Sequence, residues 1–334
     1  RSSIGKMALN GVEATASMGI DTPLAVLSHE HQPLFNYFKQ LFAQVTNPPI
    51  DCIREEIVTS TSVYVGRDGN LLEEEPKNCQ VLKINNPILT NTDMLKIKNM
   101  KVEGFKAVTV PITYYKSAPL DRAMDRLFVE VDRAHRAGAN ILILSDRGVD
   151  ENHVAIPSLL AVSAVHQHLV KTKKRTSLAI ILESGEPREV HHFATLLGYG
   201  ACAINPYLAL DTIHELIEEG MIKKDYYAAV EDYNHAVISG IVKIAAKMGI
   251  STIFEAIGIS ADVIDKYFTG TVSRVGGITL EDIAKDVDER HSQAFDPLEL
   301  STDLTLDSIG RHKSRSQGEE HRYNPRTIHT LQES

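Results

Sequence analysis

The sequence predicts an α/β fold in which parallel strands form a degenerate or incomplete (β/α) barrel. From about residue 100 to residue 220, short apolar segments alternate with longer segments of helical periodicity. Strands that are apolar on both faces are typical of parallel sheets, which need helical crossovers between consecutive strands. With weaker candidates included, about seven or eight segments could be strands, and no glycine-rich turn follows the first. Both observations favour a barrel over a nucleotide-binding open sheet.

The strongest part of the pattern contains four predicted strands. They cover residues 105–112, 140–145, 178–183 and 201–205. The helices expected after them cover residues 119–137, 156–170, 187–197 and 207–219, and Gly138 ends the first of these where a helix-terminating glycine is expected. Because short loops join each strand to its helix, we predict that the four strands lie parallel and adjacent, in sequence order, in one sheet.

The pattern is weaker outside this block. Residues 24–27, 81–84 and 248–253 are candidate strands, and residues 225–247 predict one long helix. We therefore divide residues 1–310 into an irregular amino-terminal part, 1–100, and a barrel-like part, 101–310. Residues 311–334 are polar at their start (RHKSRSQGEEHR) and predict a surface linker.

Composition excludes several classes of protein. Among 334 residues, 35 are basic and 44 acidic, so the net charge is 35 − 44 = −9 and no basic stripe favours nucleic acid. The three cysteines form no CxxC pair, which argues against a disulfide framework or an iron–sulfur site and favours the cytoplasm. No segment is apolar for long enough to span a membrane. The first residue is Arg1 rather than Met, so we expect a fragment of a longer protein.

Polar side chains follow the predicted strands at the edge where parallel α/β proteins bind ligands. Asp146 and Arg147 follow the second strand, Glu183 ends the third, and Asn205 ends the fourth. With Lys247, the set Asp146, Arg147 and Glu183 could bind an anionic small molecule and transfer protons, as in an independent barrel enzyme. Short polar residues at these positions are also what helix caps and turns require. The residues alone leave both interpretations open.

Two other patterns do not predict a site. Residues 198–203 (GYGACA) spell GxGxxA, but these glycines follow a helix and precede a strand, which is the reverse of a dinucleotide-binding turn. His191 and His192 are adjacent in a predicted helix, so their side chains point in different directions and could not bind one metal ion together. No HExxH sequence occurs.

Long, unusual strings give the clearest indication of function. They include 17–28 (SMGIDTPLAVLS), 141–150 (ILILSDRGVD), 183–193 (ESGEPREVHHF), 198–207 (GYGACAINPY) and 267–277 (YFTGTVSRVGG). Together they closely resemble the large subunit of glutamate synthase, and the matching stretch is its central domain. That family joins a glutaminase domain, the central domain, an FMN-binding barrel with an iron–sulfur cluster, and a β-helix.

The resemblance implies a flavin-type TIM barrel that has lost its flavin. The parent enzyme hydrolyses glutamine, channels the ammonia to 2-oxoglutarate and reduces the product to glutamate. It uses FMN, an iron–sulfur cluster, and electrons from a small subunit or ferredoxin. For this chain the resemblance implies a connecting, channel-lining role, with no catalytic, cofactor-binding or metal-binding residues of its own. The expected partners are the glutaminase, FMN-binding and β-helix domains.

The resemblance also marks two places of interest. Ser17, Asp21 and Thr22 form the loop that we expect to face the glutaminase domain and the ammonia path. At Ile253–Phe254 the family carries an additional glycine-containing polar segment that this sequence lacks. We predict a chain break at this join, caused by a disordered loop, with exposed flanking residues.

Overall fold

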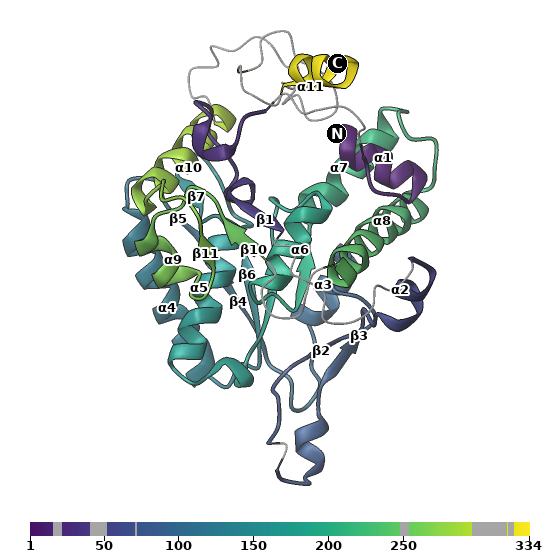
Figure 1. The fold of residues 1–334 in the computed structure, drawn as a ribbon. Helices are drawn as coiled ribbons and strands as arrows, with labels where there is room; N and C mark the ends of the chain where they lie inside the picture. Colours follow the sequence, from purple (N-terminus) through teal and green to yellow (C-terminus); the bar gives the residue numbers. More distant parts are fainter. Residues whose placement is uncertain (16–21, 41–51, 71, 248–253, 296–318, 320–323) are drawn as a thin grey trace.

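The computed structural model describes residues 1–15, 22–40, 52–70, 72–247, 254–295, 319 and 324–334. Its centre is a parallel sheet in the order β4 (Ala107–Pro111), β6 (Ile141–Ser145), β8 (Ala179–Glu183) and β9 (Ala203–Asn205) (Figure 1). The predicted order and direction of the four strands are thus confirmed. Ser17, Asp21 and Ile253 lie outside the described residues, and so does the predicted chain break. Phe254, on the far side of that break, is described: it begins a short strand and is only 3% exposed. The prediction of exposed flanking residues is therefore wrong on this side.

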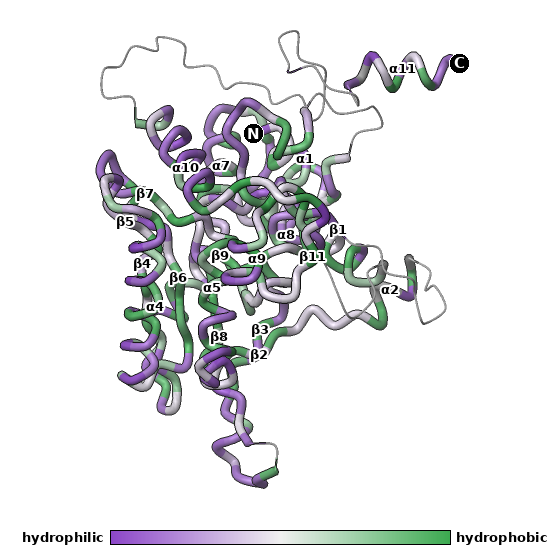
Figure 2. The backbone as a smooth tube through the Cα atoms, turned by 60° about the vertical axis from the view of Figure 1, so that its left-hand side comes forward, coloured by the Kyte–Doolittle hydropathy of each residue, from purple (hydrophilic) through white to green (hydrophobic). Residues whose placement is uncertain are grey.

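One helix follows each strand of this sheet. These helices are α4 (Leu120–Arg136), α5 (Ser158–Lys171), α6 (Val190–Gly198) and α7 (Tyr207–Glu218). In α4 most successive buried residues are three or four positions apart, from Leu120 to Ala134, so one stripe of the helix faces the core. Figure 2 shows the corresponding alternation of hydrophobic and hydrophilic bands along α4. The predicted long helix is also confirmed, as α8 (Tyr226–Lys247).

The two faces of the sheet are covered by different elements. Leu142 and Leu144 point into the main core with the crossover helices. Ile141 and Ile143 point to the opposite face, into a second core that includes Val65 and Met94. Those two residues come from β2 (Val63–Val65) and α3 (Asn91–Lys98). The face that would line a closed barrel is therefore packed with aliphatic side chains, each contributing roughly 1.5–3 kcal/mol on full burial.

The remaining strands are short. β2 pairs antiparallel with β3 (Leu82–Ile84), and β5 (Thr113–Tyr115) pairs antiparallel with β7 (His153–Ala155). A third sheet has the order β1 (Phe38–Gln40), β10 (Phe254–Ala256) and β11 (Val272–Ser273), with β1 antiparallel to β10. Within the described residues no strand pair joins this sheet to the central one. The barrel is incomplete, as predicted.

Two weaker strand predictions have different outcomes. Residues 81–84 overlap β3, which is a strand, but an antiparallel one outside the barrel sheet. The strand predicted at 24–27 is wrong, because Ala25–Leu27 forms a 3-10 turn of helix between extended residues. The third candidate, 248–253, lies outside the described residues.

The other elements complete the chain. They are the helices α1 (Ser2–Asn10), α2 (Cys52–Val58), α9 (Ala261–Tyr267), α10 (Leu280–Ala294) and α11 (Pro325–Glu333), and the 3-10 helices Leu34–Tyr37, Pro76–Cys79 and Arg175–Ser177. α11 lies in the segment predicted as a linker. None of the helices in the described part of the chain is both long and apolar enough to cross a bilayer.

Candidate functional site

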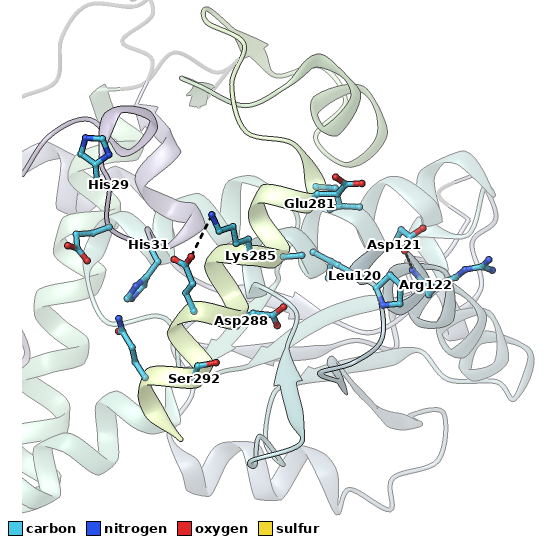
Figure 3. Close-up of a pocket in the computed structure, with 15 residues that line it drawn as sticks. His29, His31, Leu120, Asp121, Arg122, Glu281, Lys285, Asp288 and Ser292 are labelled. Atoms are coloured by element: carbon cyan, nitrogen blue, oxygen red, sulfur yellow. Dashed lines mark hydrogen bonds and ion pairs between the residues drawn. The ribbon is translucent and has the colours of Figure 1, made fainter. Parts of the chain in front are cut away.

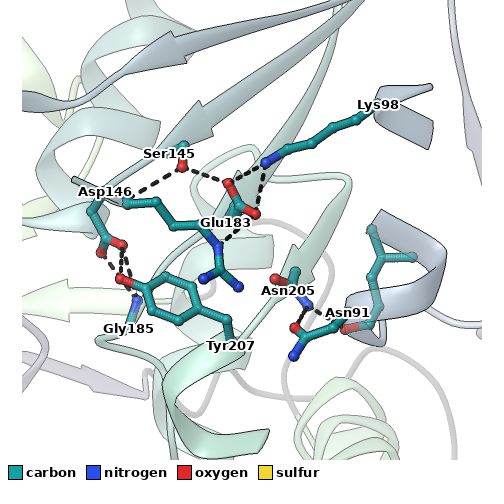
Figure 4. A network of polar contacts seen from close by, with 10 residues as sticks. Asn91, Lys98, Ser145, Asp146, Glu183, Gly185, Asn205 and Tyr207 are labelled. Atoms are coloured by element: carbon teal, nitrogen blue, oxygen red, sulfur yellow. Dashed lines mark hydrogen bonds and ion pairs between the residues drawn. The ribbon is translucent and has the colours of Figure 1, made fainter. Parts of the chain in front are cut away.

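The carboxyl ends of β6, β8 and β9 bring the predicted polar residues together. The register of the sheet places Ser145 beside Glu183 and Glu183 beside Asn205. Figure 4 shows their side chains converging with those of Asp146 and Tyr207. We call these residues, together with Lys98 and Arg147, which bond to Glu183, the strand-end network.

Glu183 is the centre of the network and is only 2% exposed. Lys98 donates from Nζ to both carboxylate oxygens at 2.8 Å, and Arg147 donates from Nε at 2.9 Å. Ser145 donates from Oγ at 2.5 Å. Burial alone would raise the pKa of Glu183, but the hydrogen bonds from Lys98, Ser145 and Arg147 lower it below its ordinary value. The carboxylate is therefore ionised and fully occupied by partners within the chain.

Lys98 is a partner of Glu183 that the sequence did not reveal. It is the last residue of α3, and backbone bonds from Leu89 and to Pro87 hold the segment before α3 against Ile204 of β9. The capping box at Thr90 and Asp93 could have indicated the helix. Nothing in the local sequence, however, indicates a partner 85 positions away. Lys247, which we had placed at a strand end, is instead the last residue of α8.

Asp146 has different surroundings, although it is also buried, with 4% exposure. Its carboxylate accepts hydrogen bonds from Ser184 Oγ at 2.5 Å, Tyr207 Oη at 2.7 Å and the Gly185 amide at 3.1 Å. Burial raises the pKa of Asp146 to about 6, and the hydrogen bonds from Ser184 and Tyr207 only partly oppose this. Asp146 thus ties together the loops after β6, β8 and β9.

Arg147 and Asn205 make further contacts that close this edge of the sheet. The Arg147 guanidinium lies over the Tyr207 ring, 4.0 Å from its centroid, where the ring face attracts the cation. Asn205 donates from Nδ2 to Leu89 O and Asn91 Oδ1. A side chain at Gly185 would place its Cβ 3.2 Å from the Tyr207 hydroxyl, so the closely packed loop favours glycine there.

These contacts describe a packed edge rather than an open binding site. Asp146, Arg147 and Glu183 do converge, as predicted, but each bonds or stacks with other residues of the chain. Within the described residues, no group of three or more His, Cys, Asp or Glu side chains is placed to hold a metal ion. Of the predicted channel loop, only Thr22 is described, and it is half-buried just before the 3-10 helix at Ala25–Leu27.

A separate groove of about 1070 Å³ lies on the outer face of α10 (Figure 3). Its walls are the loop at His29–His31, the first turn of α4 and α10 itself. None of the strand-end network lines it. We refer to it as the α10 groove.

Comparison with known proteins identifies the family. The model of the glutamate synthase central domain matches residues 1–260. The large chain of glutamate synthase [NADPH] from Bacillus subtilis is 47% identical over 96% of this chain and 21% of its own length. For glutamate synthase [NADH] of Schizosaccharomyces pombe the values are 41%, 98% and 16%. For ferredoxin-dependent glutamate synthase 2 of Synechocystis they are 39%, 97% and 22%.

The chain thus spans about a fifth of the length of these relatives. Among solved structures, the flavin-binding domain of baker's yeast flavocytochrome b2 overlaps 68% of this chain and 47% of its own, with 14% identity and a TM-score of 0.29. The alternative of an independent barrel enzyme is not supported, because the sequence matches point to another family and the strand-end residues are occupied. The chain belongs to the family of glutamate synthase central domains.

Proposed function

We propose that this chain is the connecting domain of a glutamate synthase. In this role it holds a glutaminase domain and an FMN-binding domain at a fixed separation and lines part of the ammonia path between them. The parent enzyme converts glutamine and 2-oxoglutarate to two molecules of glutamate with electrons from an external donor. The observation that carries the connecting role is the saturated carboxylate of Glu183. The edge where a barrel enzyme would bind its substrate is closed by the chain's own side chains.

The same edge of the sheet also indicates whether this chain suits a flavin. A flavin phosphate placed there would find the two nearby cations, Lys98 and Arg147, already bonded to Glu183. The strand ends that the structure describes therefore do not suit FMN. We infer that FMN and the iron–sulfur cluster belong to other parts of the parent enzyme, in the cytoplasm. The relatives are named for NADPH, NADH and ferredoxin, so the electron donor here is one of these classes.

The ammonia path is proposed to pass the loop that contains Ser17, Asp21 and Thr22. The test uses the full-length parent enzyme with the substitution Thr22→Trp. We expect glutamine-dependent glutamate synthesis to fall several-fold while glutamine hydrolysis continues, so that ammonia is released into solution. The matched control is Leu72→Trp, at a residue that is 93% exposed. Unchanged coupling between hydrolysis and synthesis in the Thr22 variant would remove this loop from the path.

The inactivity of the isolated chain is tested separately. The purified 334-residue chain should fold cooperatively and show neither glutaminase activity nor the visible absorption of flavin. Stoichiometric flavin that copurifies with it would contradict the connecting role.

A further inference from the structure

The helix α11 has an apolar side that is partly exposed: Ile328 is half-buried and Leu331 is exposed. Its cap, Asn324, accepts a hydrogen bond from the Thr327 amide at 2.8 Å, and its ion pair joins His329 to Glu333 within the helix. Ile328 and Leu331 are three positions apart and so lie on one side of the helix, with Leu331 67% exposed. An isolated helix of nine residues is marginal in water. α11 therefore needs a surface to pack against.

The α10 groove offers a surface of matching character. Leu280 and Ala284, both half-buried, supply apolar side chains to its lining, and Leu120, which also lines it, is itself buried. The charged residues around them are five acidic and two basic: Glu30, Asp121, Glu281, Asp288 and Glu289, and Arg122 and Lys285. Figure 3 shows Glu281, Lys285 and Asp288 along the side of α10 that faces the groove. An apolar floor with an acidic rim suits an amphipathic helix that carries cations.

α11 carries basic side chains, and the chain shortly before it is bonded to the wall of the groove. Arg326 and His329 are its basic side chains, against a single acidic residue, Glu333. Glu319 accepts hydrogen bonds from Ser28 Oγ at 2.7 Å and from the His29 amide at 2.6 Å, and His29 lines the groove. The six positions from Glu319 to Pro325 span at most about 20 Å. The chain thus reaches the groove from an anchor at its wall.

We propose that α11 docks in the α10 groove, with Ile328 and Leu331 on the apolar floor and Arg326 and His329 toward the acidic rim. Docking fixes the direction in which the chain continues after the domain. This inference goes beyond the proposed function, because it concerns an intramolecular contact and is independent of any ammonia path.

Disulfide trapping tests the contact in the 334-residue chain. In a background with Cys52 and Cys79 replaced by serine, the pair Ala284→Cys and Leu331→Cys is oxidised in dilute solution. The control pair joins Leu331→Cys to Val170→Cys, an exposed position at the opposite end of the crossover helices. If α11 docks, the Ala284 pair should form an intrachain disulfide at least about tenfold faster than the control pair, because docking raises the local concentration of the two thiols.

Hydrogen exchange supplies a second readout that needs no cysteine. Leu331→Asp should speed amide exchange in the α10 segment, while Leu72→Asp at another exposed position should leave it unchanged. Equal trapping rates for the two cysteine pairs would overturn the proposal, as would disulfides formed only between two chains. Amide exchange in α10 that is unchanged by Leu331→Asp would also overturn it. None of these measurements depends on glutamine hydrolysis or synthesis, so failure here is separate from failure of the connecting role.

Discussion

The strand-end network and the α10 groove use the same residue types in opposite ways. In the network, Glu183 and Asp146 are buried, and the groups that bond to them come from several different elements of the chain. Around the groove, Glu281 and Glu289 are exposed on one helix. Glu289 pairs across one turn of its own helix with Lys285, at 3.8 Å.

This difference indicates that the buried carboxylates serve folding, whereas the exposed ones are available to contact another surface. A buried carboxylate without partners costs several kcal/mol, so removing one partner from the network should lower stability markedly. An exposed carboxylate contributes little to folding and is free to contact another surface. We therefore expect changes in the network to affect unfolding, and changes around the groove to affect docking.

The largest expected effect comes from removing Lys98, one of the two cations that bond to Glu183. Lys98→Met leaves Glu183 buried with only Arg147 as a charged partner, and should lower the free energy of unfolding by about 3 kcal/mol. Urea denaturation of the 334-residue chain measures this change. The double variant Lys98→Met with Glu183→Met should recover much of the loss, because no charge is then left unpaired. A loss below about 0.5 kcal/mol for the single variant would show that the pair is dispensable.

The pH dependence of stability separates the two buried carboxylates. The pKa of Asp146 is about 6 in the folded chain, above its ordinary value of 3.8. The folded chain therefore holds this proton more tightly than the unfolded chain. The resulting stability is present at pH 4 and lost as the pH rises through about 6, by roughly 2–3 kcal/mol.

Asp146→Asn isolates this contribution, because the asparagine side chain does not bind or release a proton in this pH range. The difference in unfolding free energy between the original chain and Asp146→Asn should change across pH 4–6 and level off above it. Glu183 should act in the opposite direction, since its pKa is lowered, with stability lost as the pH falls below its ordinary range. A constant difference between pH 4 and pH 7 would refute the raised pKa of Asp146.

A smaller effect is expected from the hydroxyl that bonds to Asp146. Tyr207→Phe keeps the ring beneath Arg147 and removes one hydrogen bond, so the unfolding free energy should fall by about 1–2 kcal/mol. Tyr227→Phe is the matched control, because Tyr227 is well exposed and should lose almost nothing. Equal losses in the two variants would mean that the Tyr207 hydroxyl contributes nothing specific.

The sequence predicted the part of the fold that local pattern determines. The four central strands are short continuous apolar segments bounded by polar residues, and their order follows from the crossover helices between them. The sheet of β1, β10 and β11 was missed, because its strands have two or three residues and β1 pairs with a segment more than 200 positions away. Lys98 was missed for the same reason. Contacts distant in sequence leave no periodic signal.

The smallest effect on stability is expected around the α10 groove, and it sharpens the comparison. Glu289→Gln makes the same chemical change as Asp146→Asn, from carboxylate to amide, but at an exposed helix position with one weak ion pair. The unfolding free energy should change by no more than about 0.5 kcal/mol at any pH between 4 and 7. The same substitution should slow trapping of the Ala284→Cys and Leu331→Cys pair, because the rim loses one charge that attracts Arg326 and His329. Urea denaturation measures the change in stability, and the rate of disulfide trapping measures the change in docking. A large loss of stability with an unchanged trapping rate would place Glu289 with the structural carboxylates and break the distinction between network and groove.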